Sequence, residues 1–301
     1  MIYGSVCSGI EAATTAWHSL GWVPAWFSEI EDFPCRVLNH HYPEVPNLGD
    51  MTKICERTDV SPINLLVGGT PCQSFSVAGE RGGLDDERGN LALEFCRILE
   101  KFQPRWFVWE NVAGVLSSDK GRAFGTILGK MAECGYGVSY RILDSQHFGV
   151  PQRRRRLYAV GYLGDWRKSF SALFEPSSLC GDFTPRGKYG ASIPNVADED
   201  TQSTEDLVFV DAYNQGVSDI APTLSLPNHN SSFVVDSVGI RRYHPSECER
   251  LMGFPVGYTD IPKASRNTRH AALGNSMVVP VMKWIGTRIK AIDKQHSLLV
   301  H

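Results

Sequence analysis

Cys72 has both the residue type and the sequence surroundings of a group that could act in covalent chemistry. It follows a short apolar run, residues 63–67, which is typical of a buried strand, and Gly68, Gly69 and Pro71 lie between. The glycines allow a substrate to approach the backbone closely, and the proline stiffens the approach to the cysteine. A thiolate at the carboxyl end of a strand could act as a nucleophile. The alternative is a small buried residue, as most free cysteines are.

A carboxylate and a run of arginines could complete such a site. Glu110 lies at the end of the apolar run 105–112, where partial desolvation should raise its pKa toward acid–base use. Four consecutive arginines, residues 153–156, precede a second apolar run. If that segment is extended, Arg154 and Arg156 share one face and could direct two cations into a site. The alternative is a solvated basic patch.

The N-terminal third contains residues suited to binding a nucleotide-like ligand. Gly9 lies between a strand-like and a helix-like segment, where backbone amides meet anionic groups. Glu29 follows 20 positions later, the offset at which nucleotide-binding α/β folds place a carboxylate on ribose hydroxyls. Asp50 could accept a hydrogen bond from an adenine amino group or could instead cap a helix. Glu29 could equally be a solvated acid at a strand end.

Strand and helix patterns alternate through the first half of the chain, which predicts an α/β fold. We expect strands at residues 2–6, 24–30, 63–67, 105–112, 138–143 and 157–163, a short strand closed by Asp50, and helices at residues 91–102, 120–134 and 278–294. Residues 165–236 are rich in Ser, Pro, Gly, Asn and Asp, which is typical of a smaller, loop-rich domain. We therefore predict a catalytic and cofactor-binding domain of residues 1–164 plus 265–301 and a second domain of residues 165–264. The charged, glycine-rich segment 77–90 is expected to form a lid.

Composition limits the class of protein. The chain has 301 residues and a formal net charge of -3, so its overall charge favours no class of partner. We expect no signal peptide and no membrane span, because the N-terminus lacks a basic segment followed by a long apolar run. The eight cysteines contain no C-x-x-C pair. They predict reduced cytoplasmic thiols and no metal site.

Four motifs, taken in this order, resemble those of the DNA (cytosine-5) methyltransferase family of bacteria and phages. They are residues 69–76 (G-T-P-C-Q-S-F-S), 110–112 (E-N-V), 152–156 (Q-R-R-R-R) and 274–276 (G-N-S). The opening S-G-I-E-A-A-T-T-A-W-H and the later E-I-E are similar to those of phage and bacterial members. The resemblance implies a Rossmann-like domain that uses S-adenosylmethionine and a smaller target-recognition domain.

The resemblance also implies a mechanism. Cys72, as the thiolate, would attack C6 of a cytosine flipped out of double-stranded DNA, which makes C5 nucleophilic toward the methyl group. Glu110 would hold N3 and the exocyclic amine. Arg156 would hold the O2 side of the base, and Arg154 would support the site or a nearby phosphate.

Cofactor and DNA contacts carry over in the same way. The implied cofactor-binding residues are Ser8, Gly9, Ile10, Glu29, Ile30, Asp50, Met51, Gly69, Pro71, Leu91, Asn275 and Ser276. The implied DNA-binding residues are Gln73, Ser76, Arg81, Arg88, Thr223, Leu224 and Arg242. This chain departs from the family pattern at two positions of the adenine site. Many members have aromatic residues where this chain has Cys7 and Ile30. We expect a monomer that needs no protein partner.

Three alternatives remain at this stage. A tRNA cytosine-5 methyltransferase shares the same catalytic cysteine and glutamate, but its characteristic Cys-Phe-Thr tripeptide is missing here. A DNA-binding relative without activity would have no need of Cys72, Glu110 and Arg156. A nicotinamide-dependent dehydrogenase would explain Glu29 but neither Cys72 nor the arginines.

Overall fold

The computed structural model describes residues 1–71, 91–175, 208–211, 216–218, 221–224, 232–236 and 239–299. Its larger sheet has six strands in the order β2-β1-β3-β4-β6-β5. Their bounds are β1 Ile2–Val6, β2 Val23–Ser28, β3 Leu65–Gly68, β4 Trp106–Val112, β5 Tyr136–Asp144 and β6 Arg155–Leu163. Strands β1 to β4 are parallel, whereas β6 is antiparallel to both neighbours. The predicted α/β class is confirmed.

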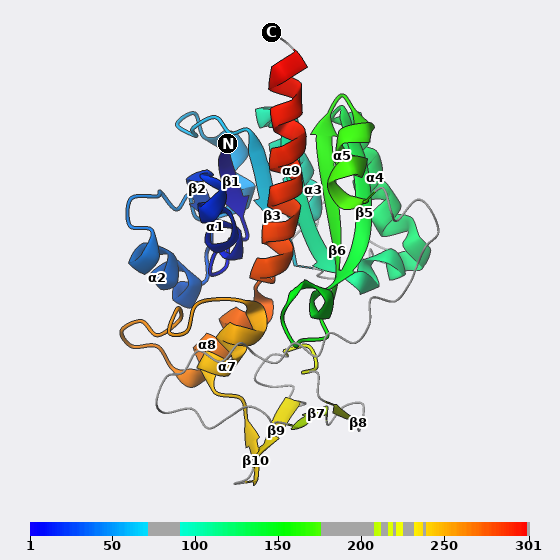
Figure 1. Ribbon diagram of the computed structural model, residues 1–301. Coiled ribbons are helices and arrows are strands. Elements are labelled where there is room, and N and C mark those ends of the chain that lie inside the picture. The colour runs from blue at the N-terminus through cyan, green and yellow to red at the C-terminus, as the bar shows by residue number, and fades with distance from the viewer. Residues whose placement is uncertain are drawn as a thin grey trace, which may run out of the picture.

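Both faces of this sheet are buried at its centre, as the apolar side chains of β3 show. In β3, Leu65 and Val67 join one hydrophobic cluster while Leu66 joins the other. Helices α1 (Ala12–Trp17), α5 (Trp166–Leu173) and α9 (Val279–Leu299) cover the first face, and α3 (Leu91–Phe102) and α4 (Arg122–Glu133) cover the second (Figure 1). An almost continuous apolar run is what a strand buried on both faces requires.

The short strand predicted before Asp50 is wrong. The chain forms only an isolated bridge there, between Phe27 and Asn47. Asp50 instead caps the 3₁₀ helix Met51–Glu56, where its Oδ1 accepts hydrogen bonds from the amide of Thr52 at 3.0 Å and from its hydroxyl at 2.8 Å. Asp50 is thus a helix cap, as is usual for aspartate before a helix, and its predicted contact with adenine stays a prediction.

Several elements beyond residue 164 adjoin the larger sheet. Helix α5 packs against β5, β6 and α9. Helices α2 (Asp32–His41), α7 (Pro245–Met252) and α8 (Arg266–Asn275) lie beside one another below β1 and β2 in Figure 1. The predicted boundary between two domains stays a prediction.

A second sheet has four antiparallel strands in the order β10-β9-β7-β8. They are β7 Val208–Asp211, β8 Gly216–Ser218, β9 Ser232–Asp236 and β10 Gly239–Arg242. A separate bridge pairs Gln152 with Ala221, next to the start of β6. Within the described part of the chain, no helix is both long and apolar enough to cross a membrane.

Candidate active site

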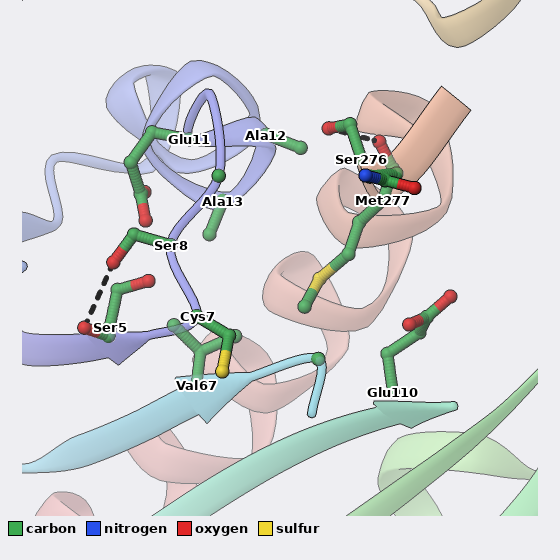
Figure 2. A pocket seen from close by; sticks show the side chains of 13 residues that line it. Ser5, Cys7, Ser8, Glu11, Ala12, Ala13, Val67, Glu110, Ser276 and Met277 are labelled. Carbon is green, nitrogen blue, oxygen red and sulfur yellow. Dashed lines mark hydrogen bonds between the residues drawn. The ribbon is translucent and has the colours of Figure 1, made fainter. Parts of the chain in front are cut away.

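The carboxyl ends of β1, β3 and β4 meet the start of β6 at one edge of the larger sheet. The start of β6 lies there because this strand runs against the others. A pocket at this edge is lined from both ends of the chain (Figure 2). Its lining includes the predicted cofactor residues Ser8, Gly9, Gly69, Asn275 and Ser276 and the predicted catalytic residue Glu110.

The turn after β1 forms one wall of the pocket, and Glu29 holds it. The Glu29 carboxylate accepts hydrogen bonds from the backbone amides of Gly9 at 2.7 Å, Ile30 at 2.8 Å and Glu31 at 2.9 Å. Glu29 is buried, so these three donors offset much of the cost of removing its charge from water. The carboxylate therefore links the turn after β1 to the end of β2.

This turn has left-handed backbone at three positions, of which only one is glycine. The φ angles are 47° at Cys7, 56° at Gly9 and 59° at Glu11. Glu11 caps α1, and its carboxylate accepts from the Thr14 amide at 3.1 Å and from the Thr14 hydroxyl at 2.6 Å. Burial raises the pKa of Glu11, while hydrogen bonds from Ser5 and Thr14 lower it less. A glycine at position 11 would adopt this left-handed backbone without strain. With glutamate there, the contacts of its side chain offset the strain.

The residues expected around adenine lie at the rim of the turn. Met51 is buried and accepts a weak hydrogen bond from the Cys7 thiol, with 3.4 Å between the sulfur atoms. Burial raises the pKa of the Cys7 thiol to about 12. Ile30 is 70% exposed, whereas Ile10 is fully buried in the core.

The segment after β3 is fixed against β4 at Thr70. The Asn111 side chain donates to the Thr70 carbonyl at 3.0 Å, and the Trp109 indole donates to the Thr70 hydroxyl at 2.9 Å. A Cβ atom on Gly69 would lie 3.1 Å from both Glu110 Oε2 and Met277 Cε. A side chain at position 69, directly after β3, would therefore crowd the ends of Glu110 and Met277.

Pro71 is exposed and is the last described residue before the nucleophile candidate. Cys72, Gln73, Ser76, Arg81 and Arg88 lie outside the described residues, as does the predicted lid, residues 77–90.

Glu110 and Arg156 form an ion pair at the pocket, with 3.3 Å between Arg156 Nε and Glu110 Oε1. Burial raises the pKa of Glu110, and the charges of Arg156 and Arg154 oppose that shift without cancelling it. Strand alternation buries Arg154 and partly buries Arg156 while Arg153 and Arg155 are exposed. The two arginines do share the face directed at Glu110.

Arg154 also fastens the far wall of the pocket. Its Nη2 donates to the backbone carbonyls of Gly274 and Ser276, each at 2.9 Å. Burial, and then the charge of Arg156, lower the pKa of Arg154 to about 10. Asn275 ends α8 and is exposed, whereas Ser276 is buried and its hydroxyl donates to the Met277 carbonyl at 3.1 Å.

Four predicted contacts lie away from this pocket. Leu91 begins α3 and packs against the cluster on the second face. Leu224 is buried, and the Thr223 hydroxyl donates to the Arg153 carbonyl at 2.7 Å. Arg242 ends β10 and is exposed.

The pocket lining also includes residues that sequence reasoning did not predict as contacts, among them Ser5, Glu11 and Met277. Glu11 could have been suspected, because it follows Gly9 closely and a buried acid is unusual in such a turn. Met277 gave no signal apart from its position after the G-N-S motif, and Ser5 gave none.

A family model described as C-5 cytosine-specific DNA methylase matches residues 1–206 and 181–291. The S. pombe Dnmt2 methyltransferase has the same fold, with a TM-score of 0.73 and 17% identity over 98% of this chain and 99% of that one.

Two relatives cover most of this chain. The Type II methyltransferase M.BsuFI of Bacillus subtilis is 33% identical over 87% of this chain and 66% of its own length. A protein of Escherichia phage P1 named DNA N-6-adenine-methyltransferase is 32% identical over 98% of this chain and 62% of its own length. The chain thus spans less than two thirds of either relative. From the family match, together with the carboxylate, the arginines and the pocket at the sheet edge, it follows that the chain belongs to the C-5 cytosine-specific DNA methylase family.

Proposed function

We propose that this protein transfers the methyl group of S-adenosylmethionine to C5 of a cytosine in double-stranded DNA. The observation that carries the proposal is the Glu110–Arg156 pair, which lies beside a pocket built from the turn after β1 and the junction of α8 with α9. A buried carboxylic acid next to a guanidinium matches the donor and acceptor pattern along one edge of a cytosine ring.

Each residue has a distinct role in the proposed reaction. The Cys72 thiolate adds to C6, and the ring then carries a nucleophilic C5. Glu110 in its protonated form donates to N3 and so stabilises the adduct, while Arg156 binds the O2 side. Once C5 carries the new methyl group, its proton passes to a base and the electron pair of that C–H bond expels the Cys72 thiolate from C6, which restores the aromatic ring.

Arg154 acts through the backbone rather than on the base. Its two bonds to Gly274 and Ser276 hold the wall that faces Glu110 across the pocket. We assign it the supporting role, because both carbonyls lie within hydrogen-bond distance of a buried guanidinium.

The pocket fits S-adenosylmethionine in two respects. Gly69 leaves free the space that a Cβ would occupy against Glu110 and Met277. The Glu29 carboxylate, which holds the turn after β1, also suits a cofactor with a positive sulfonium and ammonium group. When bound there, the cofactor supplies an electrophilic methyl group. Ser8, Gly9, Glu29 and Asn275 would hold it, and Ile30 and Met51 would border its adenine.

The proposal extends to the DNA side. A base buried in a duplex must be flipped out before C6 can be reached. We assign DNA contacts to Gln73, Ser76, Arg81, Arg88 and the exposed Arg242, and we expect Thr223 and Leu224 to support that surface. The protein would act as a monomer in the cytoplasm of a bacterial or phage-infected cell and would protect DNA from a restriction enzyme.

The name of the phage relative makes N6 of adenine the alternative target. An exocyclic amine already has a lone pair, so that chemistry would not require Cys72. The test is to incubate the protein with methyl-labelled S-adenosylmethionine and either duplex DNA or bulk tRNA, and then to identify the labelled nucleoside. Label in 5-methyldeoxycytidine supports the proposal. Label in N6-methyldeoxyadenosine, or in tRNA alone, overturns it.

A cysteine variant tests the nucleophile. We expect Cys72→Ala to abolish methyl transfer while DNA binding, measured by gel shift, stays near the wild-type level. Cys134→Ala is the matched control, because that thiol lies at the end of α4 and donates to the Cys96 carbonyl, away from the pocket. Turnover by Cys72→Ala would exclude the covalent route.

A further inference from the structure

One side chain of the segment between α7 and α8 contacts the turn after β1, which forms a wall of the pocket. Tyr258, in this segment, is buried and its hydroxyl donates to the Ile10 carbonyl at 2.8 Å. Ile10 lies between Gly9 and Glu11, two residues that line the pocket. A residue that is more than 240 positions away therefore holds the middle of the turn.

The segment between α7 and α8 is itself rigidly held by Glu249 of α7. The Glu249 carboxylate is fully buried and accepts from the amides of Gly257 at 2.6 Å and Thr259 at 2.8 Å. Arg269 of α8 pairs with the same carboxylate at 3.1 Å. A buried, fully bonded carboxylate fixes its donors strongly, because breaking any one bond leaves charge without compensation. Tyr258 thus lies between two anchored residues.

Helix α2 and the residue that follows it hold the Tyr258 ring on its other sides. The His41 ring stacks on it with 4.1 Å between centroids and 5° between planes. His41 Nε2 also lies 2.8 Å from the Tyr258 carbonyl. The Tyr42 hydroxyl is 3.1 Å from the Tyr258 hydroxyl. Because the Tyr258 proton is directed to a carbonyl, which can only accept, Tyr42 must be the donor in that pair.

The turn needs such external support. Cys7 and Glu11 have left-handed backbone that non-glycine residues adopt at a cost. The Glu11 carboxylate holds the turn from within through Thr14. Tyr258 supplies a bond from outside, to the carbonyl of Ile10 in the peptide that leads into Glu11.

We propose that Tyr258 is a positioning residue for the methyl donor, and that its bond to Ile10 keeps Gly9 and Glu11 in the geometry that binds the cofactor. The inference rests on the proposed function for the identity of that cofactor. It also makes the segment after the β10 strand part of the cofactor site.

The test uses Tyr258→Phe, which keeps the ring and its stacking and removes only the hydroxyl. We expect the Kd for S-adenosylhomocysteine, measured by calorimetry, to rise roughly two- to tenfold, the range for one neutral hydrogen bond. The KM for S-adenosylmethionine should rise with it, while kcat at saturating cofactor and the Kd for DNA stay unchanged. Amide hydrogen exchange across residues 9–15 should quicken in the free protein.

Tyr42→Phe is the matched control, because it removes a phenol from the same cluster but leaves the bond from Tyr258 to Ile10. It should bind S-adenosylhomocysteine as the wild type does. If Tyr258→Phe binds and exchanges like the wild type, or loses cofactor and DNA affinity equally, the inference is overturned while the proposed function stands. If the wild type binds no S-adenosylhomocysteine, both are overturned.

Discussion

At Glu110, burial and two guanidinium groups act on one carboxyl in opposite directions. Burial has the larger effect, so its pKa lies above the usual glutamate value. The proton that the proposed mechanism needs is therefore retained to higher pH than on an exposed glutamate, and is lost as pH rises through the raised pKa. We expect Glu110→Gln to lower kcat about 10²–10⁴-fold, since an amide donates a hydrogen bond but transfers no proton. It should also remove the fall in rate on the alkaline side.

Glu94→Gln is the control for this change. Burial also raises the pKa of Glu94, but it lies on α3 and pairs with Arg97 at 3.2 Å. Methyl transfer assays across a pH series should give wild-type behaviour for Glu94→Gln. An unchanged rate for Glu110→Gln would mean that another group handles N3.

Glu11 makes stability depend on pH. Because burial raises its pKa, the folded state binds more protons than the unfolded chain from about pH 4.5 upward, until the folded pKa is passed. The free energy of unfolding therefore falls as pH rises through that window, with a slope of at most about 1.4 kcal/mol per pH unit. In Glu11→Gln this contribution is absent, and the amide oxygen still accepts from Thr14.

Urea unfolding at several pH values measures this difference. The gap between Glu11→Gln and the wild type should move in favour of the variant as pH rises. A gap that is constant with pH would show that Glu11 is ionised equally in both states.

A site residue could be predicted from the sequence where the residues next to it in the chain carry the pattern. Glu110, Arg154 and Arg156 followed from an apolar run and strand alternation, and the structure brings them together. No local pattern encodes contacts between segments that meet across the fold. The Gly9 amide donates to Glu29, and Arg154 donates to the carbonyls of Gly274 and Ser276, in contacts of this kind. Asp50 was ambiguous because aspartate is common both at strand ends and at helix caps.

At the scale of elements, the direction of β6 decides whether the arginines reach the site. Hydrophobic alternation predicts that a strand exists but carries no sign of its direction. Had β6 run parallel to β4, its first residues would lie at the opposite edge of the sheet, away from Glu110. The position of most strands was predicted correctly, but this reversal was not, because it depends on which strands pair.

The pairing of β3 with β4 gives a further prediction. Asn111 is buried and joins the Thr70 carbonyl to the Val112 amide. Asn111→Ala leaves both without that partner, and we expect the free energy of unfolding to fall by about 1–3 kcal/mol. Since Thr70 and Pro71 lead into Cys72, kcat should fall as well.

Val112→Ala is the control, because its side chain is 39% exposed and adjoins the same strand end. Chemical denaturation and single-turnover kinetics report the two effects separately. Loss of stability with an unchanged single-turnover rate would contradict a role for Asn111 in holding the nucleophile segment.

At the scale of the whole molecule, α9 ties separate parts of the chain together. The Trp17 indole donates to the Met282 carbonyl at 2.7 Å, and Arg105 pairs with Asp293 at 3.0 Å. Arg288 donates to carbonyls at the end of α5, reaching Ala172 at 2.8 Å and Phe174 at 2.7 Å. One helix thus joins α1, β4 and α5.

Replacing Arg288 tests this tie. We expect Arg288→Met, which keeps much of the apolar stem, to lower the free energy of unfolding by about 1–3 kcal/mol, because carbonyls at the end of α5 lose their donor. Lys283→Met on the exposed side of α9 should change it little. Equal effects of both variants in urea titrations would assign the loss to the helix surface instead.

The pocket wall formed by Ser8 and Gly9 faces one formed by Ser276 and Met277, residues from opposite ends of the chain. During translation, at about 5–20 residues per second, the first wall emerges from the ribosome long before the second exists. A nascent chain therefore has no complete cofactor pocket until α8 and the start of α9 have been made and have docked. Under the proposed function, binding of the methyl donor would therefore require both walls, and a chain that lacks α8 and the start of α9 would lack one of them.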